Sequence, residues 1–147
     1  MIPVVFDTGV LISAIGWHGP AHQCLALVAR RRCRLVLSTE IDAEYEARVP
    51  TILATEAPNA NAPGALTWVR AKGLWVEPLP LGKQRSRDIK DERFLAAALA
   101  ADAKAIVSYD RDLLVLEKPF GILIMRPAGF LNWMEELQHK RGSEKGT

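Results

Sequence analysis

The chain has 147 residues, of which 49% are hydrophobic and 24% are charged, and its formal net charge is +2. This length suits one domain with a substantial core, and the composition excludes a disordered or fibrous protein. A net charge this small does not by itself indicate a nucleic-acid partner, so any acidic cluster is a local feature. No apolar run approaches the roughly 20 residues that a membrane helix needs, and no basic stretch marks a signal peptide. We therefore expect no membrane association and a cytoplasmic location.

The first predicted elements are a strand over residues 4–6 and a helix that follows it almost at once. Residues 4–6 (Val-Val-Phe) form an apolar run that is typical of a strand buried on both faces of a parallel sheet. From Val10 onwards apolar residues recur at helical spacing. Asp7 lies at this switch, and the carboxyl end of a strand is where ligands bind in open α/β sheets. Asp7 is explained equally well as a helix N-cap, so this stretch alone leaves both roles open.

A second helix is predicted to begin at Pro20, and a basic cluster follows it that includes Arg30, Arg31 and Arg34. Cations near the C-terminus of a helix interact favourably with its dipole. The same cluster is suited to bind RNA phosphates, and the sequence leaves both interpretations open.

The next predicted elements are a strand over residues 35–37 and a helix that Ser38 caps. Glu44 falls on the apolar side of this helix, and a charged residue that faces inward needs a partner or an ion. A short helix over 65–72 and a third strand over 74–76 follow. The sequence then predicts an exposed loop over 81–87 with three basic residues, Lys83, Arg85 and Arg87.

The second informative stretch begins at Asp88 and contains Asp91 in the first turn of an alanine-rich helix. A buried strand over 105–108 follows, and Asp110 comes just after it. A last strand over 121–125 and a helix from Pro127 complete the predicted domain over residues 1–140. Residues 141–147 are expected to form a polar, disordered tail.

Strands and helices alternate along the chain, which predicts a mostly parallel sheet covered by helices on both faces. Asp7 and Asp110 then lie at the same edge of the sheet, and Asp91 and Glu44 belong to helices beside it. Two carboxylates about 4 Å apart repel by roughly 4 kcal/mol near a protein surface, so such a cluster indicates a bound cation. A ligand set of oxygens alone favours Mg²⁺ or Mn²⁺, and these ions serve phosphoryl transfer and phosphodiester hydrolysis.

Four short motifs together resemble the PIN domain, and more narrowly the VapC-like toxins of toxin–antitoxin systems. They are the run 7–14 (Asp-Thr-Gly-Val-Leu-Ile-Ser-Ala), Leu37-Ser38 with Glu44, Asp88-Ile-Lys-Asp91 before Phe94, and residues 107–113 (Val-Ser-Tyr-Asp-Arg-Asp-Leu). The resemblance extends to about residue 128. It implies a three-layer α/β/α sandwich and an endoribonuclease that depends on one or two Mg²⁺ or Mn²⁺ ions. It also implies an RNA substrate, a protein antitoxin and a homodimer, and the dimer would accommodate some of the four tryptophans.

The resemblance assigns roles to particular residues of this chain. The catalytic set it implies is Asp7, Glu44, Asp91 and Asp110. The metal ligands it implies are Asp7, Asp91, Asp110 and Asp112, with supporting roles for Thr8, Ser108 and Asp88. The candidate RNA contacts are Arg30, Arg31, Arg34, Lys83, Arg85 and Arg87.

One position departs from the family pattern, because Gly9 stands where the family usually has Asn. That amide orients the first Asp or a metal-bound water. The first alternative is therefore a PIN module that binds RNA or a protein without cutting. A second alternative is a phosphatase with Asp7 as its nucleophile, but that chemistry wants an acid at the position of Gly9.

Overall fold

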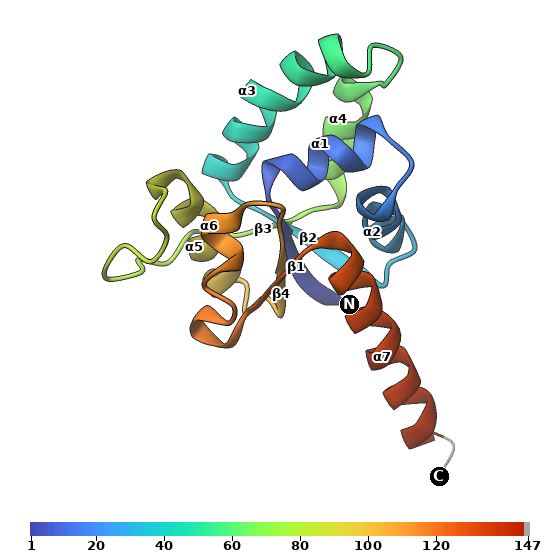
Figure 1. Cartoon of the computed structure of the whole chain (residues 1–147), viewed down its shortest axis with the longest axis vertical. Coiled ribbons are helices and arrows are strands. Elements are labelled where there is room, and N and C mark those ends of the chain that lie inside the picture. Colours follow the sequence, from blue (N-terminus) through green and yellow to red (C-terminus); the bar gives the residue numbers. More distant parts are fainter. Residues whose placement is uncertain (146–147) are drawn as a thin grey trace.

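The computed structural model describes the backbone of residues 1–145 and the side chains of residues 1–142 (Figure 1). Within this part of the chain, five strands form one parallel sheet in the order β3-β2-β1-β4-β5. The strands are β1 (Ile2–Phe6), β2 (Cys33–Leu37), β3 (Leu74–Trp75), β4 (Ala105–Val107) and β5 (Leu123–Met125). The predicted α/β fold with a central parallel sheet is confirmed.

The central strand β1 shows why the sheet is the middle of three layers. Val4, Val5 and Phe6 are all fully buried. Because successive side chains of a strand point to opposite faces, both faces of the sheet must be covered. This is the reason that β1 reads as a continuous apolar run instead of an alternating one.

Seven α-helices and two short 3-10 turns surround the sheet within residues 1–145. The helices are α1 (Thr8–Gly16), α2 (Pro20–Ala29), α3 (Thr39–Glu56), α4 (Ala62–Lys72), α5 (Glu92–Ala100), α6 (Arg111–Leu114) and α7 (Pro127–Lys145), and the turns are η1 (Ile89–Asp91) and η2 (Pro119–Gly121). Helix α5 packs against β1, β2 and β4, whereas α7 packs against β4, β5 and α2. No helix in this part of the chain has both the length and the apolar character that a membrane crossing requires.

Side-chain caps set the starts of several helices, including α1, α3 and α4. The Asp7 carboxylate accepts a hydrogen bond from the Val10 amide at 2.8 Å, and Ser38 accepts one from the Ile41 amide at 3.2 Å. Asn61 caps α4 in the same way, so α4 begins at Ala62, earlier than the predicted residue 65. Two of these caps directly follow strands, which turns the chain into a helix at the carboxyl edge of the sheet.

The final helix α7 is longer than the sequence predicts, because it continues through residue 141 to Lys145. No proline interrupts this stretch, and cations near a helix C-terminus are favourable, which explains the extension. Of the predicted disordered tail, residues 146 and 147 lie outside the described part. Figure 1 shows the C-terminal half of α7 pointing away from the rest of the domain.

The strand order creates a topological switch point between β1 and β4. The chain moves outward from β1 to β3 and then returns to β4 on the other side of β1. At such a point the connections leave the strands in opposite directions and open a crevice at the carboxyl edge. The Asp7 amide, which donates to the Val107 carbonyl at 3.0 Å, joins the two strands at this edge.

Candidate functional site

Asp7 is both a helix cap and a wall of a pocket at the switch point. One carboxylate oxygen accepts from the Val10 amide, and the other accepts from the Ser108 hydroxyl and from the Tyr109 amide at 3.3 Å. Burial raises the pKa of Asp7, and these hydrogen bonds offset part of that increase. The two roles that the sequence left open for Asp7 are therefore compatible.

Ser108 connects the ends of β1 and β4. Its buried hydroxyl donates to the Asp7 carboxylate and accepts from the Asp110 amide at 2.8 Å. Asp110 in turn accepts from the Asp112 amide at 2.9 Å and thereby caps α6. One serine thus connects the Asp7 carboxylate to the backbone of Asp110, a residue far from Asp7 in the sequence.

Asp91 is buried at the junction of η1 and α5, and one of its carboxylate oxygens lies within 4.8 Å of one of Asp110. The Ser86 hydroxyl also donates to Asp91, at 3.1 Å. Burial and, secondly, the neighbouring Asp110 raise the pKa of Asp91 to about 7, with a smaller contribution from Asp88. Near neutral pH Asp91 is therefore only partly ionised, and a cation bound beside it would favour the ionised form.

Asp88, Asp91 and Asp110 each offer a carboxylate oxygen, and these oxygens all lie within 4.8 Å of one another. The donor set contains only oxygen, which suits a hard ion such as Mg²⁺ or Mn²⁺ better than zinc. The residues present therefore fit a divalent cation. Asp88, to which the sequence assigned only a supporting role, belongs to this group.

Glu44 faces inward from α3 and is held by two partners. The Thr8 hydroxyl donates to one carboxylate oxygen, and the Arg93 guanidinium lies 3.7 Å from the other. The side chain of Glu44 is only 11% exposed, and a charge buried to this extent needs a partner. Thr8 and Arg93 are its partners.

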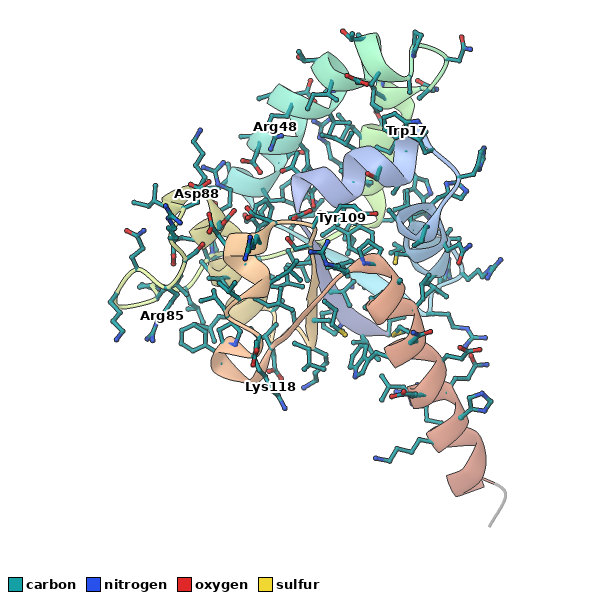
Figure 2. All side chains as sticks on the ribbon, in the orientation of Figure 1. Trp17, Arg48, Arg85, Asp88, Tyr109 and Lys118 are labelled. Carbon is teal, nitrogen blue, oxygen red and sulfur yellow. The ribbon has the colours of Figure 1, made fainter. Side chains whose placement is uncertain are left out.

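These side chains line one open pocket of about 290 Å³ at the carboxyl edge of the sheet, which we call the carboxylate pocket. Its lining includes all four residues of the predicted catalytic set, together with Asp88, Thr8 and Gly9. Figure 2 shows Arg48 on α3, Asp88 before η1 and Tyr109 after β4, three segments that meet at this pocket.

Two cations, Arg48 and Lys90, also line the carboxylate pocket. Neither is among the site residues predicted from the sequence. Arg48 lies one helical turn after Glu44, and Lys90 directly precedes Asp91. The four-residue spacing from Glu44 is the signal that identifies Arg48, since residues four apart share a helix face. A pocket with carboxylates and flanking cations can hold both a metal ion and an anionic substrate.

Other residues singled out in the sequence lie outside the carboxylate pocket. Asp112 lines a neighbouring pocket together with three arginines, Arg85, Arg87 and Arg111. The predicted exposed loop over 81–87 is fastened to the start of α5, because Glu92 accepts hydrogen bonds from the Arg85 amide at 2.8 Å and the Ser86 amide at 2.6 Å. The loop therefore carries its arginines to a fixed place beside the carboxylates.

The remaining candidate RNA contacts do not share this place. Lys83 lines a groove beside α5 with Leu79 and Ile89, whose apolar side chains are exposed. Arg31 and Arg34 line a different pocket at the opposite edge of the sheet. Arg30 is an exposed residue at the end of α2. The structure thus separates the basic residues into a group beside the carboxylates and a group far from them.

A parallel α/β sheet with buried carboxylates at its switch point defines a domain suited to metal-assisted chemistry on phosphate esters. The family model of the PIN domain matches residues 3–112, and this chain belongs to the PIN domain family. The matched range contains every acidic residue of the carboxylate pocket. Comparison with curated proteins finds no match. PIN domains are generally nucleases that use divalent metals, and the cluster of Asp88, Asp91 and Asp110 is compatible with both properties.

Proposed function

We propose that this protein is a Mg²⁺- or Mn²⁺-dependent endoribonuclease that cleaves RNA at the carboxylate pocket. The observation that carries the proposal is the close group of Asp88, Asp91 and Asp110, whose carboxylate oxygens lie within 4.8 Å of one another at the switch point of a PIN fold. Asp7, Asp88, Asp91 and Asp110, which all line the carboxylate pocket, are the proposed metal ligands, whereas Asp112 lines the neighbouring pocket. A divalent ion held by these carboxylates would activate water for attack on the phosphodiester and would stabilise the charge on the leaving oxygen.

The other residues of the pocket orient the ligands and the substrate. Ser108 holds Asp7 and Asp110, and the pair of Thr8 and Arg93 holds Glu44 at the side of the pocket. Arg48 and Lys90 are placed to bind the phosphate groups that flank the cleaved bond.

The RNA strand is proposed to continue from the carboxylate pocket across the three arginines of the neighbouring pocket, Arg85, Arg87 and Arg111. The guanidinium of Arg85 lies over the Phe120 ring at 4.9 Å, which holds the cation beside an exposed aromatic surface. Cations with an adjacent aromatic ring suit single-stranded RNA, whose bases stack and whose phosphates are accessible.

The experiment that tests this function is cleavage of single-stranded RNA by the purified protein with and without Mg²⁺ or Mn²⁺. Cleavage is expected with either ion and is expected to stop in EDTA. Asp7→Asn, Asp91→Asn and Asp110→Asn should each abolish it. Asp102→Asn is the matched control, because Asp102 is exposed and has a φ of 50°, which Asn tolerates well. Cleavage that survives all three substitutions would refute the proposal.

We further propose that the nuclease acts in the cytoplasm as the toxin of a toxin–antitoxin pair and forms a homodimer. The resemblance to the VapC-like branch supports the toxin role, and Trp17 and Trp75, each 46% exposed, are suited to an interface. Expression in a bacterial host should slow growth, and Asp91→Asn should relieve this effect at equal expression. Sedimentation of the purified protein at micromolar concentrations tests the dimer.

The second candidate function is a PIN module that binds RNA without cutting, and Gly9 is the observation that favours it. A Cβ at position 9 would lie 3.7 Å from an Asp7 carboxylate oxygen, which is ordinary van der Waals contact. Gly9→Asn therefore fits the fold and restores the usual family residue. If the wild type binds RNA without cutting it, and the Gly9→Asn variant does cut RNA, then the wild-type protein is an RNA-binding PIN module and not a nuclease.

A further inference from the structure

A second pocket, of about 390 Å³, lies at the amino edge of the sheet, and we call it the amino-edge pocket. It is formed by the end of α2, the start of β2 and the last turns of α4, and it contains Arg31, Arg34, Lys72 and Trp68. Because Ile2 at the start of β1 pairs with Cys33, this pocket lies at the end of β1 opposite to Asp7. Five residues of strand separate the two edges by roughly 16 Å, so the amino-edge pocket is not part of the carboxylate pocket.

The amino-edge pocket carries positive charge that the described part of the chain does not neutralise. None of the residues that line it is Asp or Glu. Burial raises the pKa of the Cys33 thiol to about 12, so this thiol stays neutral. Among residues 1–142, the ion pairs of arginine and lysine with carboxylates involve other cations, namely Arg70, Arg93 and Lys104. The pocket is therefore suited to an anion.

The residues that line the amino-edge pocket come mainly from helices and a strand, and some of them are apolar. The Arg34 guanidinium donates to the Gly73 carbonyl at 3.4 Å, which ties the start of β2 to the end of α4. Trp68 is half-buried on α4, and Val28 on α2 contributes an apolar side chain. The volume falls within the range of roughly 300–1,000 Å³ that is typical of pockets for small organic ligands. A ligand with both an anionic group and a flat apolar group fits this surface.

The backbone at the end of α2 fixes where the Arg31 side chain begins. The Arg32 amide donates to the Leu27 carbonyl at 2.9 Å, and the Arg31 amide donates to the Val28 carbonyl at 3.1 Å. These two bonds form a Schellman motif that ends α2, and the residue at its C′ position is Arg31, with a φ of 59°. Glycine is the usual residue at this position, so the Arg31 side chain is held beside the pocket in a conformation that glycine would adopt more easily.

We infer that the amino-edge pocket binds a nucleotide unit. The phosphate contacts Arg31, Arg34 and Lys72, and the base packs against Trp68. The nucleotide is either a free mononucleotide or one unit of an RNA strand, since both present the same phosphate and base. This inference does not depend on the proposed nuclease activity, because no group of the carboxylate pocket takes part.

The test measures binding of adenosine monophosphate, inorganic phosphate and a short RNA by titration calorimetry. All titrations contain EDTA and use Asp110→Asn protein, so that the carboxylate pocket neither binds metal nor cleaves RNA. Adenosine monophosphate is expected to bind at least about fivefold more tightly than inorganic phosphate, because stacking adds to the phosphate contacts. Equal affinity of the two ligands, or binding of neither the nucleotide nor the RNA, would overturn the inference.

Substitutions then locate the ligand. Arg31→Gly removes a phosphate contact and should weaken binding about tenfold or more, since hydrogen bonds between charged groups are the strong ones. The same change relieves the positive φ and should raise the melting temperature by a few degrees, which excludes misfolding as the cause of weaker binding. Arg32→Gln removes a neighbouring charge outside the pocket and should leave affinity nearly unchanged. If Arg31→Gly and Arg32→Gln behave alike, the ligand is not in this pocket.

A second pair of variants tests the base contact, and competition identifies the source of the nucleotide. Trp68→Leu should reduce the preference for adenosine monophosphate over phosphate, whereas Trp75→Leu, outside the pocket, should keep that preference. Retention of the preference in Trp68→Leu would overturn the base contact. If RNA displaces adenosine monophosphate, and if Arg31→Gly weakens the binding of RNA, then the bound nucleotide unit belongs to an RNA strand. Nucleotide binding without displacement by RNA identifies a free nucleotide.

Discussion

Asp91 precedes strand β4 in the sequence and Asp110 follows it, yet each places a carboxylate oxygen within 4.8 Å of the other at the carboxyl edge of the sheet. Two ionised carboxylates at this separation repel each other. Burial and, secondly, the neighbouring Asp110 accordingly raise the pKa of Asp91 to about 7. In the absence of a metal ion, protonation of Asp91 removes the repulsion between the two groups.

The first prediction is that the metal-free protein loses thermal stability as the pH rises through 7. The folded-state pKa of Asp91 is above its ordinary value near 4. The resulting stabilisation is complete below the ordinary pKa and is lost as the pH rises through the folded pKa. Melting temperatures measured in EDTA between pH 5.5 and 8.5 should therefore fall more steeply for the wild type than for Asp110→Asn. Parallel curves would show that Asp110 does not raise the pKa of Asp91.

The second prediction is that Mn²⁺ stabilises the wild type and that Asp110→Asn changes both the starting point and the response. An ion that binds only the folded state adds about 2.7 kcal/mol at 100 times its dissociation constant, or several degrees of melting temperature. At pH 8 without metal, Asp110→Asn should melt higher, because one repelling charge is gone and Asn still caps α6. Its response to Mn²⁺ should be smaller.

A surface ion site would not make the metal-free variant more stable, so the two effects must appear together. Asp102→Asn serves again as the control and should match the wild type in both measurements. If Asp110→Asn melts lower than the wild type and responds equally to Mn²⁺, Asp110 is only a helix cap.

The third prediction concerns Ser108, which donates to Asp7 and accepts from the Asp110 amide. Ser108→Ala leaves two buried polar groups short of a partner and should cost about 1–3 kcal/mol of unfolding free energy, as measured by urea denaturation. Thr67→Ala is the control: it removes a hydroxyl that donates to the Pro63 carbonyl on an exposed helix face, and it should change stability by less than about 0.5 kcal/mol. Equal effects of the two substitutions would exclude a positioning role for Ser108.

The fourth prediction is that Arg48 contributes to RNA affinity through a phosphate contact. Arg48→Gln should weaken binding of single-stranded RNA, and the slope of log affinity against log salt should become shallower by about 0.7, the value for one phosphate on a single strand. The measurement uses Asp110→Asn protein in EDTA, so that RNA is not cleaved. Lys118→Gln is the control, since Figure 2 shows Lys118 well away from Arg48 and Asp88. An unchanged salt slope for Arg48→Gln would remove Arg48 from the RNA path.

The sequence predicted the parallel α/β fold because the relevant signals are local. An apolar run such as residues 4–6, followed by a capping residue and a helical period, indicates a strand-to-helix turn without reference to the rest of the chain. Asp7 and Asp110 follow such runs, so their common place at one edge of a parallel sheet could be predicted. Glu44 was placed on the inward side of its helix by the same periodicity, and the structure partners it with Thr8 and Arg93.

Only the tertiary structure decided how the loops and the basic residues are distributed. The loop over 81–87 reads as polar and exposed, but Glu92 fastens it beside Asp91, a contact that depends on how α5 packs against the sheet. Asp88 and Lys90 join the carboxylate pocket because η1 turns them towards Asp110.

In the sequence, the basic cluster after α2 resembles the basic loop after β3. In the structure, Arg31 and Arg34 lie at the opposite edge of the sheet from Arg85 and Arg87. Strand direction causes this separation, since β2 begins where β1 begins, and the sites that precede and follow a strand lie a full strand length apart. Residue type and local period determine which side chains are charged and on which face of an element they lie. The packing of distant elements determines which of those charges meet.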